Sequence, residues 1–134
     1  MPLKANVRPH MSIDAFTDIL LEDTFVLAWH QGPESLTFHV LASLMQTHPA
    51  ASIPAVGDWA CYRPGIIQFV GVSSVRGLLP QQSVTRTTDA AGEVDYGCID
   101  MLALVQPNSY RIVGEFGDVS VTAASVSLYL AAAA

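Results

Sequence analysis

The sequence has few charged residues, and few of these are basic. Only 13% of its 134 residues are Asp, Glu, Lys or Arg, against a share of about 25% in typical soluble domains. Six basic residues stand against twelve acidic ones, so the formal net charge is −6. Because nucleic acid binding requires a basic stripe that contacts phosphates, we expect no nucleic acid partner. The acidic balance is instead compatible with a basic protein partner.

Cysteines and membrane signals are scarce as well. Two cysteines, Cys61 and Cys98, are too few for a secreted disulfide scaffold. No signal peptide pattern is present, and the long uncharged stretch 35–57 contains two histidines and two prolines, which makes it a poor membrane span. We therefore expect a cytoplasmic protein with reduced thiols and no membrane partner.

Motifs for catalysis and cofactor binding are also missing. The chain contains no Walker loop, no G-x-G-x-x-G and no G-x-S-x-G elbow. The acidic stretch 89–100 does not have the ligand spacing of an EF-hand. We predict no catalytic residues, no cofactor and no metal site, and we favour a non-enzymatic protein over an enzyme.

Apolar residues, by contrast, make up 51% of the chain. A chain of this length is typically one domain, which buries roughly two-thirds of its unfolded surface. The polar surface is thin, so some apolar area is expected to stay outside, which favours a homo-oligomer. We expect a single β domain over residues 12–130. Residues 1–11 are expected to be a vector-derived or disordered leader, since His10-Met11 matches a common cloning junction, and residues 131–134 a tail.

The N-terminal half predicts one short helix and two hairpins. Residues 12–21 place four apolar side chains on one helical face after a potential cap at Ser12. Residues 24–30 and 35–41 form the first predicted hairpin, in which position 30 pairs with 35. This register puts His30 and His39 on one face about 13 Å apart, too far to share a metal ion. The predicted core face of this hairpin consists of Phe25, Leu27, Trp29, Leu36, Phe38 and Val40.

A second hairpin is predicted from residues 58–63 and 66–72, which flank Pro64-Gly65, a pair typical of type II turns. Residues 80–93 are polar and form the longest predicted loop, where mobility is expected to concentrate.

Residues 99–130 alternate apolar and polar side chains, which is typical of an antiparallel sheet with one buried face. A turn at residues 106–109 pairs Ala103 with Ile112, and a two-residue loop at Gly117-Asp118 pairs Phe116 with Val119. Both turns place the same side chains inward.

The outward face of this predicted sheet is unusual, because it places Leu102 beside Val113 and Asp100 opposite Glu115. Like charges in a cross-strand pair are destabilising, and two close carboxylates can share a proton or hold a cation. The commoner reading is that both carboxylates point to solvent or are neutralised by a nearby arginine. Together with the outward Tyr129, this face predicts an interface made of Leu102, Leu104, Arg111, Val113 and Tyr129, with Asp100 and Glu115 as a possible acidic site.

Two stretches carry a resemblance to known proteins. The run IIQFVGV at 66–72, followed by Val75 and Gly77-Leu78, and the run YRIVGEFG at 110–117, followed by apolar residues up to Leu128, resemble small bacterial all-β proteins of uncharacterised role, some of them immunity-protein-like. The resemblance covers about half of the chain. It implies a single β domain and a protein-binding role.

We expect an all-β fold of about seven to nine antiparallel strands, forming a sandwich or a partly open barrel with one short N-terminal helix. The favoured function is a non-enzymatic protein-binding domain that forms a homodimer. An immunity-like inhibitor of a basic toxin, and a small-molecule binder or enzyme that uses a carboxylate pair, remain the alternatives.

Overall fold

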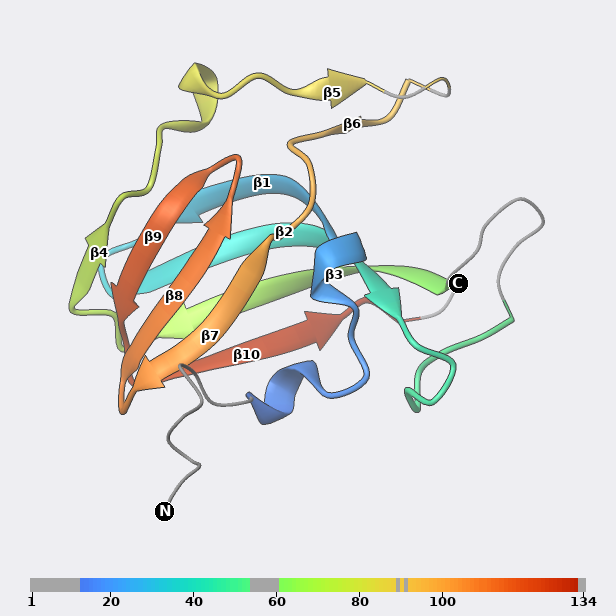
Figure 1. Cartoon of the computed structure of the whole chain (residues 1–134), viewed down its shortest axis with the longest axis horizontal. Coiled ribbons are helices and arrows are strands. Elements are labelled where there is room, and N and C mark those ends of the chain that lie inside the picture. The colour runs from blue at the N-terminus through green and yellow to red at the C-terminus, as the bar shows by residue number, and fades with distance from the viewer. Residues whose placement is uncertain (1–12, 54–60, 89, 91, 133–134) are drawn as a thin grey trace, which may run out of the picture.

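The computed structural model describes residues 13–53, 61–88, 90 and 92–132 (Figure 1). It confirms an all-β fold, in which two four-stranded antiparallel sheets pack as a sandwich. Sheet I has the order β1 (Phe25–Gln31), β2 (Ser35–Leu44), β3 (Cys61–Val70), β10 (Ser125–Leu130). Sheet II has the order β4 (Ser74–Arg76), β9 (Gly117–Thr122), β8 (Ser109–Gly114), β7 (Met101–Gln106). With the short pair β5 (Thr87–Thr88) and β6 (Val94–Asp95), the described residues form ten strands. The expected leader, residues 1–11, lies outside the described residues, as does Ser12.

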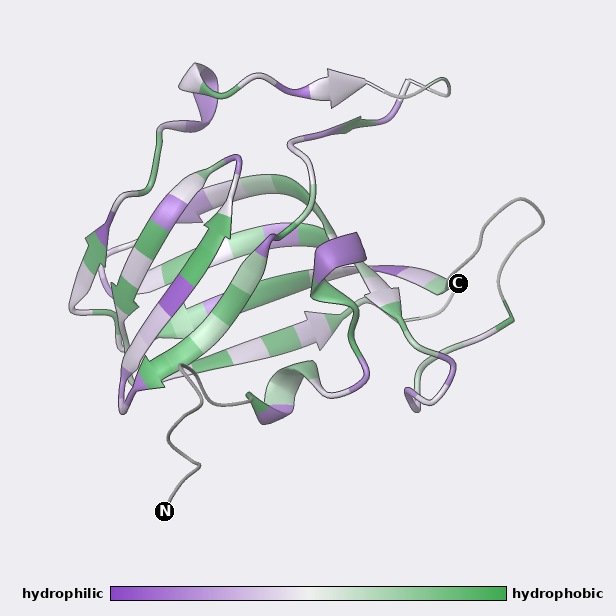
Figure 2. Ribbon diagram, in the orientation of Figure 1, coloured by the Kyte–Doolittle hydropathy of each residue, from purple (hydrophilic) through white to green (hydrophobic). Residues whose placement is uncertain are grey.

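The core lies between the two sheets and is built from alternate residues of each strand, as the banded colouring of Figure 2 shows along β8 and β9. Phe38, Phe69 and Phe116 meet at its centre, with the Phe38 and Phe116 ring centroids 4.8 Å apart. The side chains with essentially no exposure also include Val26, Leu36, Ile67, Ile99, Ile112, Val119 and Val121.

The N-terminal segment forms short 3-10 turns, η1 (Asp14–Phe16) and η2 (Leu21–Asp23), instead of the predicted helix. Asp18 adopts a left-handed backbone conformation (φ 61°), which a continuing α-helix does not allow. Ile19 then forms a β-bridge with Leu44, in which the Leu20 amide bonds to the Ser43 carbonyl and the Met45 amide to the Asp18 carbonyl (2.9 Å each), so the chain joins sheet I instead of continuing a helix. The apolar side chains of the predicted face, such as Phe16 and Ile19, are nevertheless buried.

The first hairpin forms, but its register differs from the prediction by two residues. The connecting loop is Pro33-Glu34, closed by a hydrogen bond from the Gly32 amide to the Ser35 carbonyl (2.9 Å), so His30 pairs with Thr37. A bulge at residue 27 then reverses the alternation of β1. As a result Val26 is fully buried, whereas Leu27, a predicted core residue, is 37% exposed.

The predicted second hairpin at Pro64-Gly65 is wrong, because β3 runs straight through both residues and pairs with the whole of β2. Residues 58–60 of that hairpin lie outside the described part. In a strand, the N and C=O groups of one residue point toward the same neighbouring strand. The Pro64 carbonyl accepts a hydrogen bond from the Ala131 amide (2.8 Å), so the Pro64 nitrogen also faces the β10 side, just beyond the end of that strand. The missing N–H of Pro64 therefore costs the β2–β3 ladder no hydrogen bond, which is how a proline is tolerated inside this strand.

In sheet II one turn forms as predicted and another does not. Gln106 pairs with Ser109, but a bulge at residue 105 shifts the rest of β7 by one residue, so Leu102 pairs with Ile112 and Leu104 with Tyr110. Since side chains alternate with period two, this shift turns both leucines toward the core.

The β8–β9 loop consists of Glu115 and Phe116, two residues before the predicted position. Phe116 is fully buried at the tip of this hairpin, and its carbonyl accepts a hydrogen bond from the Leu79 amide (2.9 Å). A residue of the turn therefore belongs to the core, and the alternation of side chains along a strand does not predict this.

Residues 80–93 do form a long connection, which carries η3 (Gln81–Ser83) and β5 above one end of the sandwich (Figure 1). Beyond it, residues 96–99 pair with the free edge of β1: the Tyr96 amide bonds to Val26 (2.8 Å) and the Ile99 amide to Thr24 (3.1 Å). This edge of sheet I is thus covered along its first half.

Candidate functional site

Most of the outer face of sheet I consists of side chains without charge. The strand registers arrange its side chains in four rows across the sheet. No Asp, Glu, Lys or Arg occurs at these positions, although the chain as a whole has a net charge of −6. We call this surface the uncharged face; its rows are Phe25–Leu41–Pro64, Ala28–His39–Ile66–Tyr129, His30–Thr37–Gln68–Ser127 and Ser35–Val70–Ser125.

Two hollows of about 320 Å³ each lie on or beside the uncharged face and share Pro64. One is bounded by His39, Ile66 and Tyr129, and Tyr129 is 56% exposed. The other lies at the β1 edge, where Leu27 and Leu41 meet β6, and the acidic residues Glu93 and Asp95 border it on the β6 side. Apolar side chains around shallow hollows are a common feature of protein-binding surfaces.

A polar cluster anchors one end of this face. One carboxylate oxygen of Asp23, Oδ2, accepts hydrogen bonds from Ser43 Oγ and from the Tyr62 hydroxyl, both at 2.7 Å. Thr24 Oγ1 accepts a further bond from the Ser43 amide (3.1 Å). The buried hydroxyl of Ser43 is therefore satisfied, and η2 is held against sheet I.

The structure separates the residues predicted to form one interface. Leu102 and Leu104 pack against the core from the inner side of sheet II, so the outward apolar pair of Leu102 and Val113 is wrong in its register. Arg111 lies on the outer side of sheet II, where it forms a bidentate ion pair with Asp118 at 2.8 and 2.6 Å. Tyr129 is exposed, as predicted, on the opposite sheet.

The Arg111–Asp118 ion pair places two opposite charges on the outer side of sheet II. Its hydrogen bonds lower the pKa of Asp118 and raise the pKa of Arg111. Both side chains are about half exposed, so solvent screens the pair and its contribution to stability is small.

The predicted carboxylate pair does not form a cross-strand pair. Asp100 precedes β7, with its amide bonded to the Val113 carbonyl (2.8 Å), whereas Glu115 lies in the β8–β9 loop. The register shift in β7 and the earlier loop together remove the predicted opposition.

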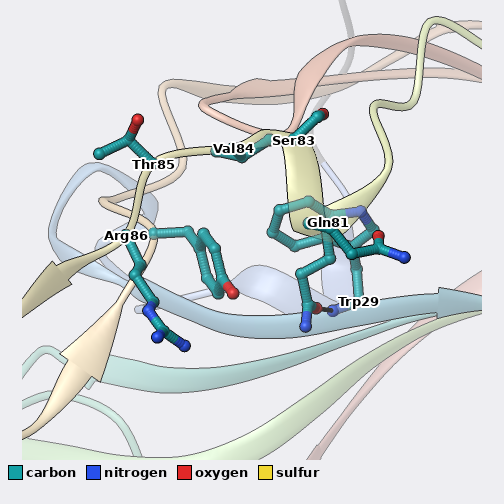
Figure 3. Close-up of a pocket in the computed structure, with 8 residues that line it drawn as sticks. Trp29, Gln81, Ser83, Val84, Thr85 and Arg86 are labelled. Carbon is teal, nitrogen blue, oxygen red and sulfur yellow. Dashed lines mark hydrogen bonds between the residues drawn. The ribbon is translucent and has the colours of Figure 1, made fainter.

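A larger pocket, of about 790 Å³, lies between the loop 81–86 and β1 (Figure 3). Its wall includes Trp29, Tyr96 and Arg86. The Trp29 indole donates to the Leu79 carbonyl (2.9 Å), and the Gln81 side-chain oxygen accepts from the Trp29 amide (2.8 Å). The tryptophan thus fixes the loop that forms one wall. Neither Asp100 nor Glu115 is among the lining residues.

The two cysteines are free and occupy different environments. Hydrogen bonds from the amide and hydroxyl of Ser52 lower the pKa of the buried Cys61 thiol. Burial, followed by the nearby carboxylates of Asp23, Asp95 and Asp100, raises the pKa of Cys98.

Sequence reasoning missed the uncharged face. Its signal was present as the absence of charge from the outward positions of four strands, but reading it required the registers of β1 and β3, which the sequence predicted incorrectly. Within the described residues, no group of three or more His, Cys, Asp and Glu side chains is placed to hold a metal ion. Among the same residues, no helix combines the length and apolar character of a membrane span.

Comparison of the chain with protein-family models, with curated proteins and with solved structures finds no match in any of the three.

Proposed function

We propose that the protein is a non-enzymatic binding module that forms a homodimer through the uncharged face of sheet I. The observation that carries this proposal is the lack of any charged residue in the four rows of that face, together with the exposed Tyr129. Of the residues that the sequence predicts as an interface, Tyr129 lies on this face, whereas Leu102 and Leu104 pack against the core.

The lack of charge on this face suits a second copy of the chain as its occupant. Two chains that each carry a net charge of −6 repel each other, and the repulsion is smallest when the surfaces in contact carry no charge. The outer side of sheet II, which carries Arg76, Arg111 and Asp118, is less suited to an apolar self-contact. An isologous dimer buries the same rows from both copies.

The size of the face limits the area of the contact. Four strands about 4.8 Å apart span roughly 20 Å, which gives an interface at the low end of the specific size range. Because area alone does not determine affinity, the oligomeric state must be measured as a function of concentration.

Sedimentation equilibrium or light scattering over a concentration series tests the proposal. Tyr129→Asp places a charge at the centre of the proposed contact and is expected to keep the chain monomeric at concentrations at which the wild type dimerises. Ser120→Asp adds the same charge at an exposed position of sheet II and serves as the control. A wild type that stays monomeric throughout, or a Tyr129→Asp variant that dimerises equally well, would refute it.

A small-ligand site is the second candidate, because the 790 Å³ pocket falls in the size range of ligand sites and is bordered by an arginine. Among the described contacts, the Arg86 guanidinium has no hydrogen-bond or ion-pair partner. A small carboxylate fits this lining. Titration of a carboxylate panel, followed by the NMR signal of the Trp29 indole N–H, tests it, with Arg86→Gln expected to abolish and Arg76→Gln to preserve any shift. No response from wild type to any carboxylate would rule this candidate out.

A further inference from the structure

Two histidine rings lie together on the uncharged face. His30 on β1 pairs with Thr37, and His39 on β2 pairs with Ala28, so the two histidines are diagonal neighbours across the β1–β2 ladder. Diagonal neighbours are within reach of each other when the side chains are long or aromatic. The imidazole centroids are 5.4 Å apart with an angle of 35° between the rings. The sequence-based separation of about 13 Å is therefore wrong, because the two-residue register change moves His39 toward His30.

This spacing fits two ligands of a single ion. With metal–nitrogen bonds of about 2.1 Å, two imidazoles on one tetrahedral ion have ring centres roughly 5 Å apart. In the single chain His30 is exposed and His39 is partly exposed, so an ion can reach both rings from solvent when the uncharged face is not covered by a second copy.

The ring nitrogens of this pair are also available. Among the described hydrogen bonds, neither the His30 nor the His39 imidazole has a partner. His48 is different, because its Nδ1 accepts a hydrogen bond from the Ala50 amide (3.0 Å). His48 therefore provides a matched control with one nitrogen already occupied.

We propose that His30 and His39 form a bidentate site for a divalent transition metal ion of the imidazole-binding class, such as Zn²⁺, Ni²⁺ or Cu²⁺. Water completes the coordination, since the described residues supply no third protein ligand to a common site. The bound ion keeps open positions at the surface. The site goes beyond the proposed function, and binding does not require the dimer.

Titration with Ni²⁺ alone, followed by calorimetry and by histidine NMR signals, tests the site. His10→Gln is introduced into every protein, so that His30, His39 and His48 are the remaining imidazoles. The second imidazole binds an ion already held by the first, so its removal is expected to weaken affinity on the order of 100-fold. His30→Gln and His39→Gln should each cause this loss, and His48→Gln should leave affinity unchanged.

Three results would overturn the proposal. They are no Ni²⁺ binding by the His10→Gln protein, an Ni²⁺ affinity that His30→Gln or His39→Gln leaves unchanged, and an affinity that His48→Gln lowers. Unchanged melting temperatures without metal show that the variants are folded. Repeating the titration at low and at high protein concentration separates the site from the dimer. Equal Ni²⁺ affinity at both concentrations supports the metal site whether or not the dimer proposal holds, whereas binding that is lost at the low concentration contradicts its independence from the dimer.

Discussion

Asp23 joins the N-terminal turn to the outer side of sheet I through two short hydrogen bonds. Asp23→Ala removes the acceptor of the Ser43 hydroxyl, which is fully buried. A buried hydroxyl without a partner costs about 1–3 kcal/mol, so we expect the free energy of unfolding to fall by that amount. Glu22→Ala removes the same charge from an exposed neighbour in η2 and should change it by less than about 0.5 kcal/mol. Urea denaturation of the three proteins measures both values, and equal losses would contradict the role of the hydrogen bonds.

At this scale the sequence predicts exposure better than partnership. Alternation in residues 125–130 correctly places Tyr129 outward, because exposure depends only on the local period of the strand. The partners of Asp23 are 20 and 39 residues away in the chain, so only the assembled sheet brings them together. The His30–His39 contact was missed for the same reason, although both histidines were correctly placed on one face.

The antiparallel strands were predicted correctly in type, but ten form where about seven to nine were expected, the N-terminal helix is replaced by 3-10 turns, and the registers were predicted poorly. The bulges at residues 27 and 105 each add one residue to a strand, and no glycine marks either position. One extra residue reverses every inward and outward assignment beyond it, which is why Leu27 became exposed and Leu102 turned inward. Pro64 led to the opposite error, the prediction of a turn inside a continuous strand. Its missing N–H faces the point where β10 has ended, so β3 continues through the proline without losing a ladder hydrogen bond.

The crossing of the β4–η3 connection over the β8–β9 hairpin depends on two glycines. Gly117 has a φ of 125°, and a Cβ there would lie 2.2 Å from the Gly77 carbonyl oxygen. Gly92 also has a positive φ (86°), but a Cβ there would meet nothing within 4 Å. Gly92→Ala therefore incurs only the backbone cost, about 1–3 kcal/mol at most, whereas Gly117→Ala incurs that cost and a steric clash. We expect thermal denaturation to show a clearly lower melting temperature for Gly117→Ala than for Gly92→Ala.

Equal melting temperatures for the two variants would mean that the crossing can shift without cost. A second measurement shows where Gly117→Ala perturbs the structure. Amide exchange at Leu79, whose N–H bonds to the Phe116 carbonyl, should accelerate in Gly117→Ala and not in Gly92→Ala.

The whole molecule has two outer sheet faces of different character. Sheet II presents the Arg111–Asp118 ion pair and Arg76, whereas sheet I presents no charge within its rows. The low overall charge content, visible in the sequence, indicated that apolar area would stay outside. Which sheet carries it could not be predicted, because the assignment follows from the registers of all four strands.

This asymmetry makes the effect of salt on self-association a test of which face is used. Raising the salt concentration from about 0.01 M to about 1 M shortens the Debye length from about 30 Å to about 3 Å. A dimer joined through the uncharged face loses only the mutual repulsion of two −6 chains, so we expect its dissociation constant to fall several-fold. Sedimentation equilibrium at the two salt concentrations measures it. Dissociation on adding salt would instead mean that charged groups hold the copies together, and it would move the contact to the Arg111–Asp118 side. A complex with a basic partner, as the immunity-like alternative requires, would likewise weaken as salt screens its opposite charges.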